Sequence, residues 1–154
     1  TVADIALLAR SIPNLGLIVI DYLGLIGGEE KGMNIYERVT ANSGALKRLA
    51  RSMGIPVLCL AQLNRESEKR NDKRPTMADL RDSGAIEQDA DIVMFLYRPD
   101  YYRAEVAEDK QEEIDDQLTE LIVAKNRHGQ VGTAKLHFDP DFTRFTTPDN
   151  YHED

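Results

Sequence analysis

The chain has 154 residues and a formal net charge of −8. Its 42% hydrophobic and 30% charged residues are the balance of a folded globular domain, which excludes a disordered or fibrous protein. The sequence has no apolar run long enough to cross a membrane, and its first residues lack a signal-peptide pattern. A single cysteine, Cys59, excludes an internal disulfide framework and favours a reducing compartment, and three scattered histidines do not predict a zinc site.

The acidic balance limits how the chain can contact nucleic acid. A uniformly basic surface that coats nucleic acid is excluded, so any such contact must come from a local patch. The sequence begins with Thr1 and not with methionine, and we interpret it as a fragment or a processed product.

The first half of the sequence predicts helices that alternate with short strands. Apolar residues at helical spacing predict helices over 1–12 and 35–53, the second ended by Gly54. Short apolar runs rich in β-branched residues predict buried strands at 17–20 and 56–60. Because one helix joins these two strands, a right-handed crossover is expected to make them parallel.

The second half predicts mostly strands. A polar stretch, 64–83, contains one short helix near Pro75. It is followed by predicted strands at 92–96, 118–124, 132–138 and 143–146, with an exposed acidic connection at 100–116. The first two of these are predicted to be buried, the strand at 118–124 on both faces because it shows no alternation. The strand at 132–138 alternates and is expected to pair back as a hairpin. The pattern predicts an α/β fold with a partly parallel sheet and an antiparallel edge hairpin.

Two polar side chains follow the two predicted parallel strands. Asp21 and Gln62 should emerge at the same sheet edge, where open α/β sheets bind ligands. An acid after four apolar residues is typical of a Walker B strand, in which it holds Mg²⁺, usually through water. A glutamine nearby can sense a γ-phosphate or orient water. The alternatives are that Asp21 only caps a turn and that Gln62 is a loop amide that satisfies backbone groups.

A basic stretch follows Gln62 directly. Residues 65–81 include six basic and four acidic side chains, so this stretch is locally positive in an acidic chain. A mobile loop of this kind can place arginines and backbone N–H groups on phosphates. No aromatic residues are interleaved for base stacking, so such contacts would follow the phosphate backbone. The alternative is a solvated surface loop.

Two cations stand two residues apart in the stretch 125–129. Lys125 and Arg127 point the same way if they lie on a strand, and at a hairpin tip they can reach a neighbouring subunit as an arginine finger does. The alternative is an ordinary charged turn. The sequence also lacks the pattern GxxxxGK[ST], so by itself it is not expected to cradle nucleotide phosphates.

Together these motifs resemble the C-terminal ATPase domain of the DnaB family of replicative hexameric helicases. The resemblance rests on the strings LIVIDYLGLI, IPVLCLAQLNRESEKRNDKRPTMADLRDSGAIEQDADIVMFLYR and IVAKNRHGQVGTAKLHFDPDFTRF. The long middle string is specific, whereas the first fits any RecA-like ATPase. The resemblance implies a partial RecA-like P-loop NTPase fold, a mostly parallel sheet flanked by helices with an antiparallel edge hairpin at its C-terminal end. Residues 1–147 would be the C-terminal part of that domain and 148–154 a polar tail.

The resemblance implies roles for four residues in nucleotide hydrolysis. Asp21 matches the Walker B acid near Mg²⁺, which it would contact through water. Gln62 matches the glutamine that links the γ-phosphate to DNA binding. Lys125 and Arg127 match the pair that reaches the nucleotide of the neighbouring subunit.

Three further residues match the loop that grips the backbone of single-stranded DNA. These are Arg81, Asp82 and Gly84, and Asp82 replaces an expected glutamate while keeping its charge. Gly24 stands where the family often has glutamine, a change for which the sequence offers no functional explanation.

The function implied is that of an ATP-dependent DNA helicase. Subunits would form a homo-hexamer that hydrolyses ATP with Mg²⁺ between neighbours and moves 5′ to 3′ along single-stranded DNA. A primase and a helicase loader are the further partners implied, in the cytoplasm of a bacterial or phage-infected cell. The family's Walker A loop and catalytic glutamate lie upstream of its Walker B strand and are missing here, so the fragment alone is expected to be inactive.

Two other functions compete with this one. A RecA-like recombinase-type ATPase would share Asp21 and Gln62, but the long middle string argues against it. A non-enzymatic interaction module, or one half of a split gene, would explain the missing Walker A loop, but the retained candidate residues argue against decay.

Overall fold

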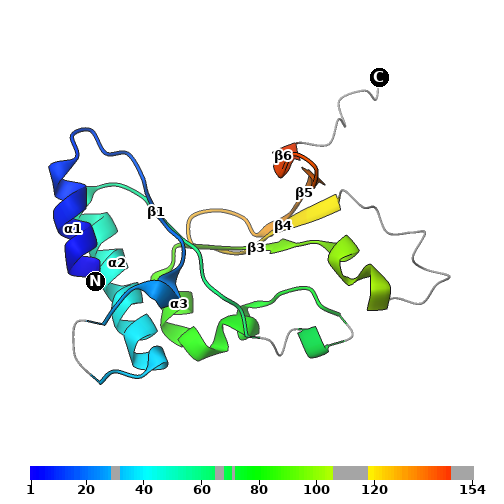
Figure 1. Ribbon diagram of the computed structural model, residues 1–154, viewed down its shortest axis with the longest axis horizontal. Helices are drawn as coiled ribbons and strands as arrows, with labels where there is room; N and C mark the ends of the chain where they lie inside the picture. The colour runs from blue at the N-terminus through cyan, green and yellow to red at the C-terminus, as the bar shows by residue number, and fades with distance from the viewer. Residues whose placement is uncertain (29–31, 65–67, 71, 106–117, 147–154) are drawn as a thin grey trace. The chain divides into compact units, whose positions relative to one another are not determined.

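The computed structural model describes residues 1–28, 32–64, 68–70, 72–105 and 118–146, without the side chains of 81–83 and 103–105 (Figure 1). The predicted polar tail, 148–154, and most of the predicted acidic connection, 100–116, lie outside the described residues. The chain divides into two compact units, Thr1–Ala90 and Asp91–Asp154, and each is described by itself.

Both long helices of the first unit begin at a side-chain cap. In α1 (Val2–Ser11) the Thr1 hydroxyl accepts a hydrogen bond from the Asp4 amide at 3.3 Å. In α2 (Ile35–Met53) the Asn34 side chain accepts from the Glu37 amide at 2.9 Å. These caps satisfy amides that have no partner within the helix. The two predicted helices are confirmed.

The predicted end of α2 is confirmed as well. Gly54 has a φ of 67°, and its N–H donates to the Ala50 carbonyl at 3.0 Å. Glycine adopts this left-handed conformation without the steric cost of a Cβ atom, which explains why the helix ends there.

The strands β1 (Ile18–Ile20) and β2 (Val57–Cys59) pair in parallel, with Ile18 opposite Val57. This confirms the predicted crossover through α2. A short 3₁₀-helix, η1 (Leu23–Leu25), follows β1 in the region after Asp21.

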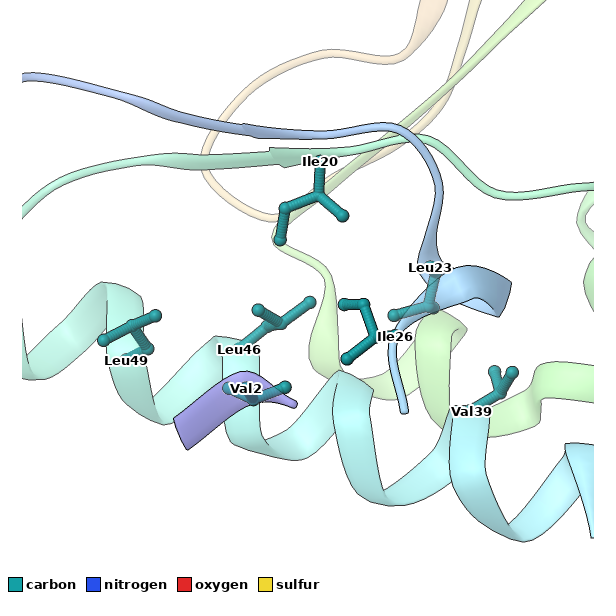
Figure 2. Packing of buried hydrophobic residues seen from close by; sticks show 7 residues of the cluster. All are labelled: Val2, Ile20, Leu23, Ile26, Val39, Leu46 and Leu49. Carbon is teal, nitrogen blue, oxygen red and sulfur yellow. The ribbon is translucent and has the colours of Figure 1, made fainter. Parts of the chain in front are cut away.

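One face of this pair packs on the helices. Figure 2 shows Ile20 of β1 directed toward the row of apolar side chains on α2, with Leu23 and Ile26 between them. The buried cluster consists of Val2, Ile20, Leu23, Ile26, Val39, Leu46 and Leu49. Burial of these side chains is the main favourable contribution to the stability of the unit.

A 3₁₀-helix and a short α-helix complete the first unit. The predicted short helix in the polar stretch is confirmed as η3 (Met77–Ser83). It continues into α3 (Gly84–Asp89), which lies against α2 and which the sequence did not predict (Figure 1). The Ser43 hydroxyl on α2 donates to the Asp89 carboxylate at 2.8 Å and ties the two helices together.

The second unit is an antiparallel sheet in the order β3-β4-β5-β6. Its strands are β3 (Ile92–Tyr97), β4 (Leu118–Asn126), β5 (Gly132–Asp139) and β6 (Arg144–Thr146). A 3₁₀-helix, η4 (Pro99–Glu105), follows β3. The predicted hairpin and last short strand are confirmed. The antiparallel part is larger than an edge hairpin, because β3 also pairs antiparallel with β4.

The prediction that the early strands are buried is wrong for one face of each. Val19 and Leu58 are 59% and 43% exposed, because the helices of the first unit cover only the opposite face of the β1–β2 pair. In β3, Val93 and Phe95 are buried whereas the residues between and beside them are exposed. By contrast, Thr119 and its neighbour Glu120 in β4 are both buried, as expected for a strand covered on both faces there.

The core cluster generates a stability prediction. Leu46 is 6% exposed in the middle of α2, so Leu46→Ala should lower the free energy of unfolding by about 2–4 kcal/mol through lost burial and a cavity. Arg51→Ala on the exposed side of the same helix is the control, with an expected change within about 0.5 kcal/mol. Denaturant unfolding measures both, and equal effects would contradict the assigned core.

Candidate functional site

The ends of β1 and β2 hold Asp21 and Gln62 at one edge of the parallel pair. The Leu60 N–H donates to the Ile20 carbonyl at 2.9 Å, and the Leu23 N–H donates to the Leu60 carbonyl at 2.9 Å. The two segments that leave the strands therefore run side by side. The predicted meeting of Asp21 and Gln62 at one sheet edge is confirmed.

An open hollow of about 290 Å³ lies at this edge. It is lined by Asp21, Tyr22, Leu60, Ala61 and Gln62. Both polar side chains are exposed, and the peptide bond between Asp21 and Tyr22 is cis. A carboxylate and an amide facing the same open space can bind a hydrated cation and a phosphate oxygen together.

Tyr22 lines this hollow and is a residue that the sequence reasoning missed, and Gly24 lies against its ring. A Cβ atom at Gly24 would lie 2.7 Å from the Tyr22 ring, so glycine leaves room for the ring where it stands. The Gly24 carbonyl also accepts a hydrogen bond from the Arg38 guanidinium at 3.2 Å. Glycine at position 24 thus avoids a close contact with the Tyr22 ring, which only the folded loop reveals.

The DNA-binding candidates lie at the junction of η3 and α3. Arg81 and Asp82 belong to η3, and their side chains are outside the described part of the chain. Gly84 has an ordinary helical conformation with φ −51° and ψ −23°. A Cβ atom there would meet no described atom within 4 Å, so the described part of the fold does not require glycine at this position.

The basic stretch contains an ion pair that the sequence reasoning missed. Arg70 contacts Asp79 through both carboxylate oxygens, at 2.9 and 2.8 Å. Asp79 is buried, whereas Arg70 remains partly exposed. Because Arg70 and Asp79 are nine residues apart and do not lie on one helix or strand, no sequence pattern predicts that they pair.

The two cations of the second unit lie where β4 ends. Lys125 is paired with Val93 inside the sheet, and Arg127 begins the turn between β4 and β5. The Arg127 N–H donates to the Asp91 carbonyl at 2.8 Å, and its guanidinium lies 3.6 Å from the Asp91 carboxylate. The turn position of Arg127 is thus confirmed, whereas Lys125 belongs to the strand.

The turn itself is shaped by Asn126 and Gly129. The Asn126 side chain accepts from the His128 N–H and donates to the Gln130 carbonyl, both at 3.3 Å. A Cβ atom at Gly129 would come within 2.6 Å of the Asn126 amide, so glycine is required for this close approach. His128 also lies in this turn.

Among the described residues, no group of three or more histidine, cysteine, aspartate or glutamate side chains is arranged to hold a metal ion. None of the described helices is long and apolar enough to cross a membrane.

Comparison with known proteins identifies what the chain is similar to. Residues 1–147 match the family model of the DnaB-like helicase C-terminal domain. The chain is 49% identical to the replicative DNA helicase DnaB of Geobacillus stearothermophilus, over 85% of this chain and 28% of that protein. It is 44% identical to a probable plasmid replicative DNA helicase of Chlamydia psittaci, over 95% of this chain and 30% of that protein.

Solved structures agree with these sequence matches. One, described as an ATPase domain, superposes with a TM-score of 0.80 at 37% identity, over 95% of this chain and 49% of that one. A DnaB-like replicative helicase, described with its interactions with primase, superposes with a TM-score of 0.81 at 37% identity, over 95% of this chain and 34% of that one. The chain spans less than a third of the length of the curated relatives it matches.

The thiol of Cys59, at the end of β2, should react with alkylating reagents in a way that depends on pH. Burial raises the pKa of the Cys59 thiol to about 11, so at pH 8 roughly one thiol in a thousand is ionised, against about a quarter for an ordinary thiol. Alkylation of the Cys59 peptide at pH 8, followed by mass spectrometry, should be roughly 250-fold slower in the folded protein than in urea and should still accelerate above pH 9. Half-maximal reactivity near pH 8.5 in the folded protein would contradict the assigned burial.

Proposed function

The chain belongs to the DnaB-like helicase C-terminal domain family, and from this premise we propose that it is part of a replicative helicase. The whole protein hydrolyses ATP with Mg²⁺ and moves 5′ to 3′ along single-stranded DNA to unwind a duplex. The observation that carries the proposal is the hollow at the ends of β1 and β2, where Asp21 and Gln62 face the same space.

Asp21 is suited to a magnesium ion bound to nucleotide. Mg²⁺ keeps several waters and takes one or two carboxylates together with phosphate oxygens, so a single exposed carboxylate in an open hollow fits it. When bound, Mg²⁺ neutralises charge on the phosphates during phosphoryl transfer. In this proposal Asp21 orients the hydrated cation, while the phosphates are cradled by a segment that this sequence does not contain.

Gln62 is the residue that senses the nucleotide. Its amide can hydrogen-bond a γ-phosphate oxygen or the attacking water, and the contact is lost when the γ-phosphate leaves. Asn64, two residues further on, is hydrogen-bonded to the segment that leads to Arg81. Loss of the phosphate contact can therefore be transmitted toward the DNA side over a short stretch of chain.

Arg127 and Lys125 act on the nucleotide of a neighbouring subunit in a homo-hexameric ring. The Arg127–Asp91 pair is half-exposed on both sides, at 42% and 49%, and such pairs contribute only about 0–1 kcal/mol. Exchange of this one contact for a phosphate oxygen would therefore cost little. Positive charge placed on the transferring phosphoryl group promotes its transfer to water.

Arg81, Asp82 and Gly84 form the contact with the backbone of single-stranded DNA. The support comes from Gly84, because a Cβ atom there would meet no described atom within 4 Å, so the described part of the fold does not need glycine at this position. Close approach of a DNA backbone would require it. Arg81 would supply the cation, and Asp82 an acceptor for a neighbouring donor.

The remaining partners follow from the family. A primase and a helicase loader would bind the whole protein in the cytoplasm of a bacterial or phage-infected cell. The similarity to replicative helicases over most of the chain supports this function over a recombinase-type ATPase. A non-enzymatic interaction module is the remaining alternative, and the next experiment separates it from the helicase.

Arg127→Ala in the intact protein should reduce ATP hydrolysis on the order of 10³-fold, because charge stabilisation of the transferring phosphoryl group is lost. Nucleotide binding should remain nearly unchanged. His128→Ala, the adjacent exposed turn residue, is the control and should hydrolyse ATP at the rate of the unaltered protein. Hydrolysis that survives in Arg127→Ala would remove the finger assignment, and no hydrolysis in the unaltered protein would favour the non-enzymatic module.

Arg81→Ala should weaken binding of single-stranded DNA in a salt-dependent way. Removing one phosphate contact lowers the slope of log K against log salt by about 0.7 for a single strand. Arg51→Ala on α2 removes the same charge away from the proposed contact and should leave that slope unchanged. An identical slope for Arg81→Ala and the unaltered protein would take Arg81 out of the DNA contact.

A further inference from the structure

Asp79 is a buried carboxylate in a stretch that is otherwise polar and exposed. Its side chain is almost fully covered, with a residue exposure of 5%. It accepts two hydrogen bonds from Arg70, at 2.9 and 2.8 Å, and two from Thr76, at 2.7 Å from the amide and 3.1 Å from the hydroxyl. Burial alone would raise the pKa of Asp79, but these hydrogen bonds outweigh it and the pKa is lowered. The carboxylate is therefore charged at neutral pH.

Arg70 also holds the main chain around it. Its guanidinium donates to the carbonyl of Arg74 at 2.9 Å and to the carbonyl of Asp72 at 3.4 Å. With the bidentate contact to Asp79, its donors are directed into its own segment. This set of hydrogen bonds uses the rigid, planar guanidinium group, which lysine lacks.

A backbone hydrogen bond at Asp79, beside its ion pair with Arg70, joins two parts of the segment that lie far apart in the sequence. The Asn64 N–H donates to the Asp79 carbonyl at 3.0 Å, so the chain just after Gln62 is fastened to the first turn of η3. Asn64 is two residues from Gln62, and Asp79 is two residues from Arg81. The described contacts thus form a short connection from the nucleotide side to the DNA side.

We infer that Arg70 and Asp79 are positioning residues that make Gln62 and the Arg81–Gly84 segment move as one body. Arg70 is then not a phosphate ligand, although it lies in the basic stretch. The inference rests on the proposed function, because it concerns how hydrolysis at Gln62 is coupled to DNA bound at Arg81. Arg70 transmits that coupling through Asp79 and touches neither the nucleotide nor DNA.

The test compares Arg70→Ala with Lys73→Ala in the intact protein. Lys73 is a cation of the same segment whose ammonium donates to the Glu68 carbonyl at 2.8 Å, so its removal controls for charge. Three quantities are measured, namely ATP hydrolysis without DNA, its stimulation by single-stranded DNA, and the salt dependence of DNA binding.

Arg70→Ala should keep hydrolysis without DNA within about twofold and lose stimulation by DNA about tenfold, the usual range of coupling between two sites. Its slope of log K against log salt should equal that of the unaltered protein, since no phosphate contact is lost. Arg70→Lys should fail to restore stimulation, because lysine lacks the planar fork. Lys73→Ala should keep the stimulation.

Four results would overturn the inference. Undiminished stimulation in Arg70→Ala would show that the pair does not couple the sites. A salt slope lowered by about 0.7 would make Arg70 a phosphate ligand. If Arg70→Ala lost hydrolysis without DNA together with the stimulation by DNA, the pair would only stabilise the fold. If the unaltered protein itself shows no hydrolysis stimulated by DNA, the proposed function fails, and the inference that rests on it fails too.

Discussion

Two hydrogen bonds at Leu60 determine where the candidate site lies. Its N–H donates to the carbonyl of Ile20, the last residue of β1, and its carbonyl accepts from the N–H of Leu23 beyond the strand, so the contact between the two chain segments continues past their last paired residues. Asp21 and Gln62 come together because of this, and the cluster on α2 holds the strands in place from one side. Without the continued pairing, the two polar residues would lie on independent loops.

Local patterns predict much of this fold because its elements carry strong local signals. Asn34 and Gly54 mark the two ends of α2 by capping, and β-branched runs mark β1 and β2. The meeting of Asp21 with Gln62 follows from these elements and the handedness of the crossover. The helix α3 escapes prediction because six residues, GAIEQD, are too few to show an apolar period.

The contacts that sequence reasoning missed are all between side chains distant in sequence or dependent on loop shape. Arg70 contacts Asp79, and Gly24 leaves room for the Tyr22 ring, but no sequence pattern predicts either contact. The exposed faces of β1 and β2 were missed for a different reason. An apolar run predicts burial, but whether a strand is covered on one face or two depends on what packs against it.

The number of positive charges in a stretch of this chain is a poor guide to the residues proposed to contact phosphates. The chain is acidic overall, and several of its arginines are engaged within it. Arg38 donates to the Gly24 carbonyl, and Arg70 pairs with buried Asp79. Arg98 pairs with Asp100 and also lies over the Phe138 ring. Arg127 differs from these because its pairing with Asp91 is longer and half-exposed. The carboxylate that Arg127 contacts is 49% exposed, against 4% for Asp79 and 18% for Asp100, so of these three ion pairs it is the one most open to solvent.

The most direct test of this account is the structure of the intact protein with an ATP analogue, Mg²⁺ and single-stranded DNA. The account predicts Asp21 roughly 4 Å from Mg²⁺ through one water, with the Gln62 amide within hydrogen-bond distance of the γ-phosphate. It further predicts that Arg127 of the neighbouring subunit faces the same phosphate. A nucleotide bound away from the ends of β1 and β2, with Asp21 and Gln62 facing only solvent, would contradict it.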